Sequence, residues 1–129
     1  MRDYQRQREN PYLLPEYLYK SIKYAIKDYD RILQERLDIL HSSPSPRFDT
    51  PKGTDVSSPT DSKALRLAAL SKQLECIDQA LVQVPHEYRR GVFNEARYGG
   101  GFPGDAGIAT YKRWKQRFVY WTAKNMKLW

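Results

Sequence analysis

The feature that most constrains the fold is a pair of helical apolar patterns separated by a segment that cannot be regular. In residues 16–40 the apolar positions recur at three- and four-residue steps, which places them on one face of a helix. In residues 62–84 they alternate steps of three and four, as in helices that pair with other helices. The two sets are Leu18, Ile22, Ile26, Tyr29, Leu33, Leu37 and Leu40, and Leu67, Leu70, Leu74, Ile77, Leu81 and Val84.

Residues 42–61 lie between these patterns and are rich in Pro, Ser and Thr, which excludes regular structure. The chain therefore divides into an N-terminal helix (residues 1–41), a loop (42–61) and a helical domain (62–129). The second stripe, the Leu67–Val84 seam, can pair with the first in an antiparallel hairpin or with a second copy in a homodimer. The hairpin is favoured because one chain then buries both stripes.

The remaining residues predict two further helices. Pro85 ends the seam helix, and residues 86–98 restart it until the glycines at 99–101 terminate it. Gly91 weakens this helix and suggests a close contact with a neighbour. Residues 102–109, in which Pro103 can begin one helical turn, lead to a final helix with Thr110 as its N-cap. The predicted fold is all-α, a long helical hairpin plus a C-terminal helix-turn-helix.

The last twenty residues, 110–129, form the most basic part of the chain. No acidic residue occurs from Ala106 onward, while six Lys and Arg residues do. Helical spacing sorts the segment into an aromatic side with Tyr111, Trp114, Phe118, Trp121 and Asn125, and an opposite side with Lys112, Arg113, Gln116, Ala123 and Lys127. The aromatic side suits a core, and the basic, amide-bearing side suits a DNA major groove. The alternative is an amphipathic helix with a solvated basic face.

Net charge and residue types bound the function further. A net charge of +7 on 129 residues favours an anionic partner, most often nucleic acid. No apolar run approaches the roughly 18–20 residues that span a bilayer, and the polar N-terminus is not a secretory signal, so we expect a cytoplasmic protein with no membrane association. Cys76 is the single cysteine, and no catalytic set or metal-ligand spacing stands out. We therefore expect no enzyme activity, no metal and no cofactor.

The order of elements after the seam resembles region four of bacterial sigma factors. The matching residues are Leu81, Val84, Pro85, Glu87, Arg89, Val92, Phe93, Arg97 and Tyr98. With the long first helix and the loop included, the chain is similar to the RinA/ArpU-type phage transcription regulators, most clearly over residues 61–92. The resemblance implies a scaffold helix, a recognition helix, binding of double-stranded DNA and possible contact with RNA polymerase. Residues 102–109 depart from it, because this scaffold element is shorter than usual.

These observations predict a sequence-specific DNA-binding regulator of a phage or prophage, acting in the cytoplasm of a bacterial host. The N-terminal part of a recognition helix reaches base edges, so Lys112, Arg113 and Gln116 are predicted to face bases. The predicted phosphate contacts are Lys115, Arg117, Lys124 and Lys127, with Arg89 and Arg90 as weaker candidates. The alternatives are a packaging component like a small terminase subunit, a helical adaptor that binds an acidic protein, and a sigma-like protein that requires polymerase.

Overall fold

The computed structural model describes residues 10–41 and 59–129, and the regular structure in these ranges is entirely helical. The helices are α1 (Glu16–Lys27), α2 (Tyr29–His41), α3 (Pro59–Val82), α4 (His86–Tyr98) and α5 (Ile108–Asn125). The all-α prediction is therefore confirmed. Most of the predicted loop lies outside the described residues, but its last three positions, 59–61, belong to α3. No helix in the described ranges is long and apolar enough to cross a membrane.

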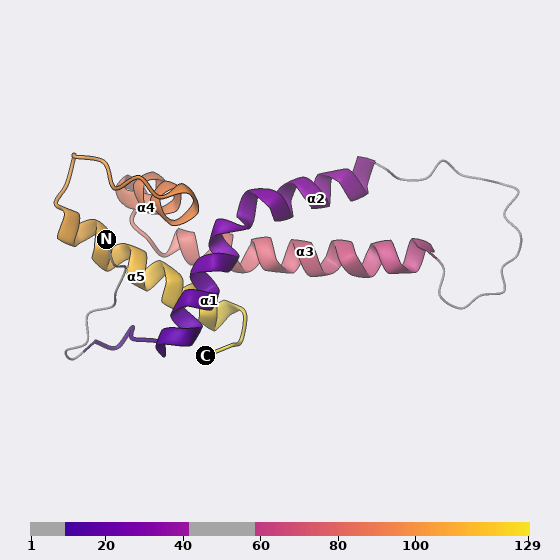
Figure 1. Cartoon of the computed structure of the whole chain (residues 1–129), viewed down its shortest axis with the longest axis horizontal. Helices are drawn as coiled ribbons and strands as arrows, with labels where there is room; N and C mark the ends of the chain where they lie inside the picture. The colour runs from indigo at the N-terminus through magenta and orange to yellow at the C-terminus, as the bar shows by residue number, and fades with distance from the viewer. Residues whose placement is uncertain (1–9, 42–58) are drawn as a thin grey trace, which may run out of the picture.

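The first predicted helix is in fact two helices, with Asp28 between them. The N–H of Asp28 donates to both Tyr24 O and Ala25 O, at 3.1 and 3.2 Å, a sharing that is common where helices end. The chain changes direction between α1 and α2 (Figure 1). The bend has a packing reason, because Ile26 lies in the main core while Ile32 packs against α3. One straight helix could not place Ile26 in the main core and Ile32 against α3.

The predicted hairpin is formed by α2 and α3, which lie side by side and extend away from the other helices (Figure 1). We call α2 and residues 59–74 of α3 the arm. Its buried cluster consists of Ile32, Leu70 and Leu74. Further along the seam, Ile77 and Val84 are fully buried in the main core. Four of the six seam residues are thus buried within one chain, as the hairpin alternative predicts.

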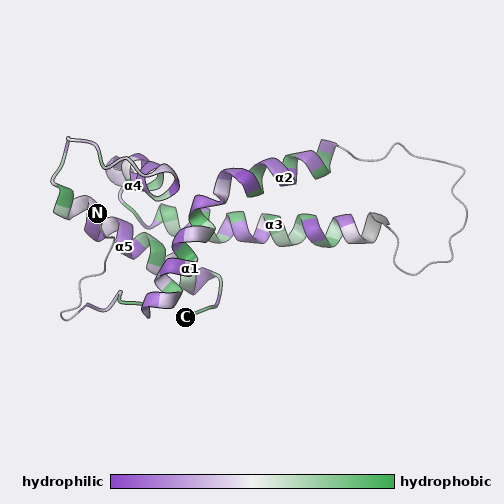
Figure 2. Ribbon diagram, in the orientation of Figure 1, coloured by the Kyte–Doolittle hydropathy of each residue, from purple (hydrophilic) through white to green (hydrophobic). Residues whose placement is uncertain are grey.

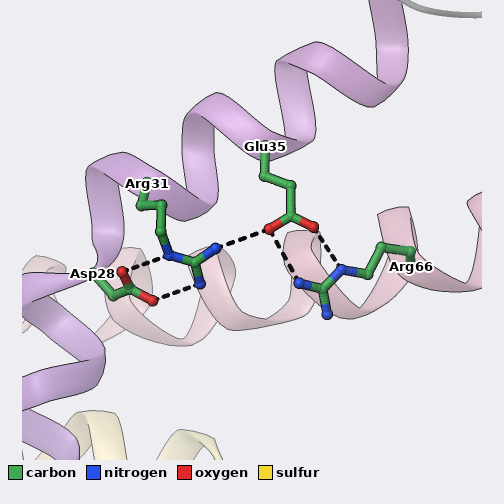
Figure 3. Close-up of polar contacts among 4 residues, drawn as sticks. All are labelled: Asp28, Arg31, Glu35 and Arg66. Carbon is green, nitrogen blue, oxygen red and sulfur yellow. Dashed lines mark hydrogen bonds and ion pairs between the residues drawn. The ribbon is translucent and has the colours of Figure 1, made fainter.

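One edge of the arm is fastened by charged side chains (Figure 3). The Arg31 guanidinium donates to both carboxylate oxygens of Asp28, at 2.7 and 2.6 Å, and to Glu35 at 3.0 Å. From α3, Arg66 donates to both oxygens of the same Glu35 carboxylate, at 2.7 and 3.0 Å. Because both arginine side chains are more than half exposed, solvent screens these ion pairs. They add little to stability, and their main effect is on how α2 and α3 are positioned relative to each other.

The main core lies where α1, α4, α5 and the C-terminal part of α3 meet. Hydrophilic and hydrophobic residues alternate along the helices, so each helix turns only one side to this core (Figure 2). Burial of each large apolar side chain stabilises the fold by about 1.5–3 kcal/mol. The fully buried core residues include Ile22, Ile26, Ile77, Val84, Val92, Phe118 and Val119.

Residues 99–107 connect α4 to α5 as a loop, without the short scaffold helix that was predicted around Pro103. Gly99, Gly100 and Gly101 have φ values of 77°, 93° and 93°, which other residues rarely adopt. A compact helix-turn-helix is therefore not confirmed, and α5 begins at Ile108 with Gly107 as its N-cap, in place of the predicted Thr110.

This loop is nevertheless fixed to both helices. A Cβ atom on Gly91 would lie 2.7 Å from Pro103 Cδ and 2.7 Å from Tyr111 Cε1, which confirms the close contact expected at this glycine. The ring of Phe102 stacks on Tyr111, with centroids 5.2 Å apart and planes 9° apart. The Tyr111 hydroxyl donates to Asp105 at 2.5 Å. These contacts hold α4, the loop and the start of α5 as one packed unit.

Candidate nucleic-acid interface

Burial shows which side of α5 faces inward. The buried positions are Tyr111, Lys115, Gln116, Phe118, Val119, Thr122 and Ala123. Trp114 and Trp121 are only partly buried. The inward side is therefore turned from the predicted aromatic stripe toward Val119 and Ala123. Ala123, which was predicted on the basic side, is fully buried. The reason is that α5 contacts α1, α3 and α4, so it needs a wider buried side than one aromatic stripe supplies.

This rotation removes Gln116 from the predicted base-facing set. Its side chain is only 9% exposed, and Nε2 is buried without a hydrogen-bond partner among the described residues. An amide in that position cannot reach the edge of a base while α5 stays packed. The sequence pattern failed here because Gln is polar, and its burial follows from neighbours that the pattern does not contain.

Lys115 is likewise not a phosphate contact in this structure. Its ammonium lies 3.2 Å from Glu95 Oε1, and the side chains of the two residues are 10% and 16% exposed. The second oxygen of Glu95 accepts the N–H of Gly101 at 2.6 Å. The pair therefore joins α5 to α4 and to the glycine turn. Sequence reasoning missed Glu95, since nothing in its spacing marks it as a partner for Lys115.

Four residues form a continuous row along the solvent side of α5, which we call the outward row: Arg113, Arg117, Tyr120 and Lys124. Their spacing of four, three and four residues places them on one face. Arg113 and Lys124 are exposed, and Arg117 and Tyr120 are partly exposed. Within the described ranges, none of the three cations forms an ion pair with a carboxylate. Lys112 is exposed beside the start of the row.

Aromatic rings order the middle of this row. The guanidinium carbon of Arg117 lies 4.6 Å from the ring centroid of Tyr12 and 4.8 Å from that of Trp114. Tyr12 also meets Tyr120 edge-on, with centroids 5.3 Å apart and planes at 88°. The ammonium of Lys124 lies 5.8 Å over the Tyr120 ring. Such contacts are worth about 0.5–1 kcal/mol each at exposed sites, enough to favour one rotamer over the others.

Tyr12 is a residue of this surface that sequence reasoning missed. It precedes α1, and its N–H donates to Asn10 Oδ1 at 2.9 Å. A signal was present, because residues 11–15 read PYLLP, and Leu14 in that stretch is 97% buried in the main core. The segment before α1 is thus packed against the body of the protein, next to α5.

The two arginines of α4 differ in their surroundings. Arg89 Nε donates to Val84 O at 2.8 Å, and Nη2 donates to Val82 O at 3.0 Å. These are carbonyls at the C-terminal end of α3, which a basic side chain commonly satisfies. This capping role accounts for Arg89 without a phosphate contact. Arg90 is exposed on α4.

The C-terminal end of α5 is fixed in place, which makes the outward row rigid. Leu128 N–H donates to Ala123 O and Lys127 N–H donates to Lys124 O, each at 3.0 Å. Lys127 has φ 62°, so this end forms a Schellman motif with a lysine where glycine is usual. The side chain of Asn125 donates to Cys76 O at 3.0 Å and ties the helix to α3.

The outward row has the size and chemistry of a groove-binding surface. From Arg113 to Lys124 it is about 17 Å long at 1.5 Å per residue, and a major groove about 12 Å wide admits one helix.

Within residues 10–41 and 59–129, no three potential metal ligands come together. Burial raises the pKa of the Cys76 thiol, which makes it a poor nucleophile.

Comparisons with family models, with curated proteins and with solved structures found no match.

Proposed function

We propose that this protein is a sequence-specific, double-stranded-DNA-binding regulator of transcription of phage or prophage type. The observation that carries the proposal is the outward row of α5, whose cations are unpaired with carboxylates in the described residues, on a helix held by the core. The resemblance to RinA/ArpU-type regulators supports the same assignment. In this proposal the protein acts by binding and not by catalysis.

The proposed roles follow from position along α5. Lys112 and Arg113, in its first turns, face base edges. Lys124 and Lys127, near its end, bind phosphates, with Arg90 on α4 as a weaker contact. Each phosphate contact releases counterions, so these two to three contacts give a log–log salt slope of about −2 to −3.

Selection of bound duplexes from a random pool, at near-physiological salt, tests the proposal. We expect an enriched motif and binding that weakens steeply with added salt. Uniform binding without enrichment would exclude sequence-specific regulation. Repeating the selection with RNA polymerase present separates a self-sufficient regulator from a sigma-like protein, which binds its site only with polymerase.

A charge-reversal pair provides the matched control. Arg113→Glu with Lys124→Glu places two acids on the outward row and should abolish duplex binding. Lys20→Glu with Lys27→Glu makes the same charge change on exposed positions of α1, away from the row, and should weaken binding much less. Equal losses in the two double variants would mean that net charge alone drives binding.

A second candidate function is an adaptor that binds an acidic protein, and the solvent side of α1 favours it. Tyr17 and Tyr24 are 76% and 67% exposed there, with Lys20 and Lys27 on the same side. Exposed tyrosines next to lysines suit a protein contact. An adaptor would show no salt-dependent affinity for duplex DNA.

A many-subunit ring in light scattering would instead favour the packaging alternative.

A further inference from the structure

We propose that Arg117 is a guanine-reading residue of the outward row and that Tyr12, from the segment before α1, is the residue that positions it. The inference rests on the proposed DNA-binding function and adds to it a base preference and a second part of the chain. From the sequence alone, Arg117 was predicted to contact phosphate.

Arg117 differs from the other cations of the row in its surroundings. Arg113 and Lys124 are exposed, whereas Arg117 is partly buried, with its guanidinium over the rings of Tyr12 and Trp114 at 4.6 and 4.8 Å. In the described part of the chain, Arg117 forms no ion pair. Its charge is therefore oriented by rings and not neutralised by a carboxylate.

Ring contacts of this kind leave the hydrogen-bonding edge of a guanidinium accessible. The two contacts are made by the guanidinium carbon, which lies over ring faces, while the N–H donors of the group point away from that carbon. Guanine presents two acceptors, O6 and N7, to the major groove, and a guanidinium binds both at once. A phosphate can be bound by a flexible cation, but a bidentate contact with a base benefits from a side chain ordered beforehand.

Tyr12 has the contacts that a positioning residue needs. Its ring meets Tyr120 and Trp121 of α5 edge-on, with centroid distances of 5.3 and 5.6 Å. Its backbone N–H is held by Asn10, and it follows Pro11, whose fixed φ restricts the approach of the chain. The side chain that orients Arg117 thus comes from a segment about one hundred residues away in the sequence.

Duplex selection with a set of variants tests the inference. Wild-type protein is compared with Tyr12→Ala, Tyr12→Phe, Arg117→Lys and the control Tyr17→Ala, which removes the same side chain from an exposed site on α1. We expect Tyr12→Ala and Arg117→Lys to lose the same single guanine preference from the enriched motif. Their affinity for the wild-type motif should fall about tenfold or more, with less than a twofold change on random duplex. Tyr12→Phe and Tyr17→Ala should keep the wild-type motif.

The outcomes separate this inference from the function on which it rests. If wild-type protein enriches a motif and Tyr12→Ala and Arg117→Lys enrich the same one, Arg117 does not read a base and the inference is overturned. If Arg117→Lys alone loses a guanine position, the role of Tyr12 is overturned. If wild-type protein enriches nothing, the proposed function fails and the inference fails with it. Arg117→Lys keeps the charge and the helix, so its result does not depend on the folding of Tyr12→Ala.

Discussion

Nζ of Lys115 lies 3.2 Å from Oε1 of Glu95, inside the contact between α5 and α4. Since the other carboxylate oxygen accepts the N–H of Gly101, one carboxylate connects two helices and the loop between them. A cation that the sequence places in the basic C-terminal segment is thus part of the folded framework. Its removal should affect stability before it affects binding.

We therefore expect Lys115→Met to lower the free energy of unfolding by about 1–3 kcal/mol, because it leaves the partly buried Glu95 carboxylate without its cation. Denaturant unfolding measures the loss. Lys124→Met, an exposed change on the same helix, should cost no more than about 0.5 kcal/mol. The double variant Lys115→Met/Glu95→Gln should recover part of the loss. Equal stability of Lys115→Met and wild type would mean that the pair contributes nothing.

The helices were predictable because their signals are local. The apolar stripes, Pro85 and the glycines at 99–101 lie within the segments that they define, and α4 ends at Tyr98 as expected. The bend at Asp28 was not predictable. It arises because Ile26 and Ile32 pack against different partners, and a one-dimensional pattern with steps of three and four continues through it without interruption.

The candidate site was predictable only in part, for the same physical reason. Lys112 and Arg113 lie at the surface as the helical spacing indicated. The number of helices that surround α5 decides how wide its buried side is. Because that side is wide, it includes Gln116. The contact of Arg117 with Tyr12 joins residues far apart in sequence, so no spacing within the helix could reveal it.

Gly91→Ala should destabilise the protein although alanine favours helices by about 1 kcal/mol over glycine. The new Cβ would lie 2.7 Å from Pro103 Cδ and from Tyr111 Cε1, and the Tyr111 ring is held by its stacking on Phe102 and its hydrogen bond to Asp105. Overpacking of this kind costs about 1–3 kcal/mol, so we expect a lower melting temperature.

Gly104→Ala is the matched control for that change. A Cβ on Gly104 has no neighbouring atom within 4 Å, and its φ is not in the left-handed region. Thermal unfolding should show no loss for Gly104→Ala, or a gain of about 0.4–1 kcal/mol from the restricted unfolded chain. Similar behaviour of the two alanine variants would contradict the close contact at Gly91.

Lys127→Gly should raise the stability of the protein. Lys127 occupies the left-handed position of the Schellman motif at φ 62°, a conformation that costs a non-glycine residue about 1 kcal/mol. We expect a gain of about 0.5–1 kcal/mol in denaturant unfolding. Lys127→Ala removes the same charge but keeps the backbone strain, so it should bring no such gain. A gain of equal size in both variants would assign the effect to charge.

Stability should fall at high pH through two tyrosines. The hydrogen bond to Asp105, together with burial, raises the pKa of Tyr111 to about 12. Burial and the hydrogen bond to Asp78 raise the pKa of Tyr29 to about 12. Both folded-state pKa values exceed the ordinary value near 10, so the stabilisation is complete below about pH 10 and is lost as the pH rises through about 12.

Unfolding measured between about pH 9 and about pH 11.5 checks this dependence. Tyr111→Phe removes one of the two phenol groups with a raised pKa described above. The stability of this variant should therefore decline less over this interval than that of wild type. Tyr24→Phe, at an exposed position on α1, should follow the wild-type curve. Parallel curves for Tyr111→Phe and wild type would show that the Tyr111–Asp105 hydrogen bond does not favour the protonated phenol.

Arg113→Ala and Lys124→Ala should separate base reading from phosphate binding on the outward row. Arg113 lies near the N-terminal end of α5, where base edges are reached, so its loss should cost about 1–3 kcal/mol on a selected site and much less on random duplex. Lys124 lies in the last turns, so Lys124→Ala should weaken both duplexes alike and reduce the salt slope by about 1. Titrations of both duplexes at several salt concentrations measure these effects. If Arg113→Ala weakens the two duplexes equally, Arg113 binds phosphate, and the base-reading part of α5 must begin closer to Arg117.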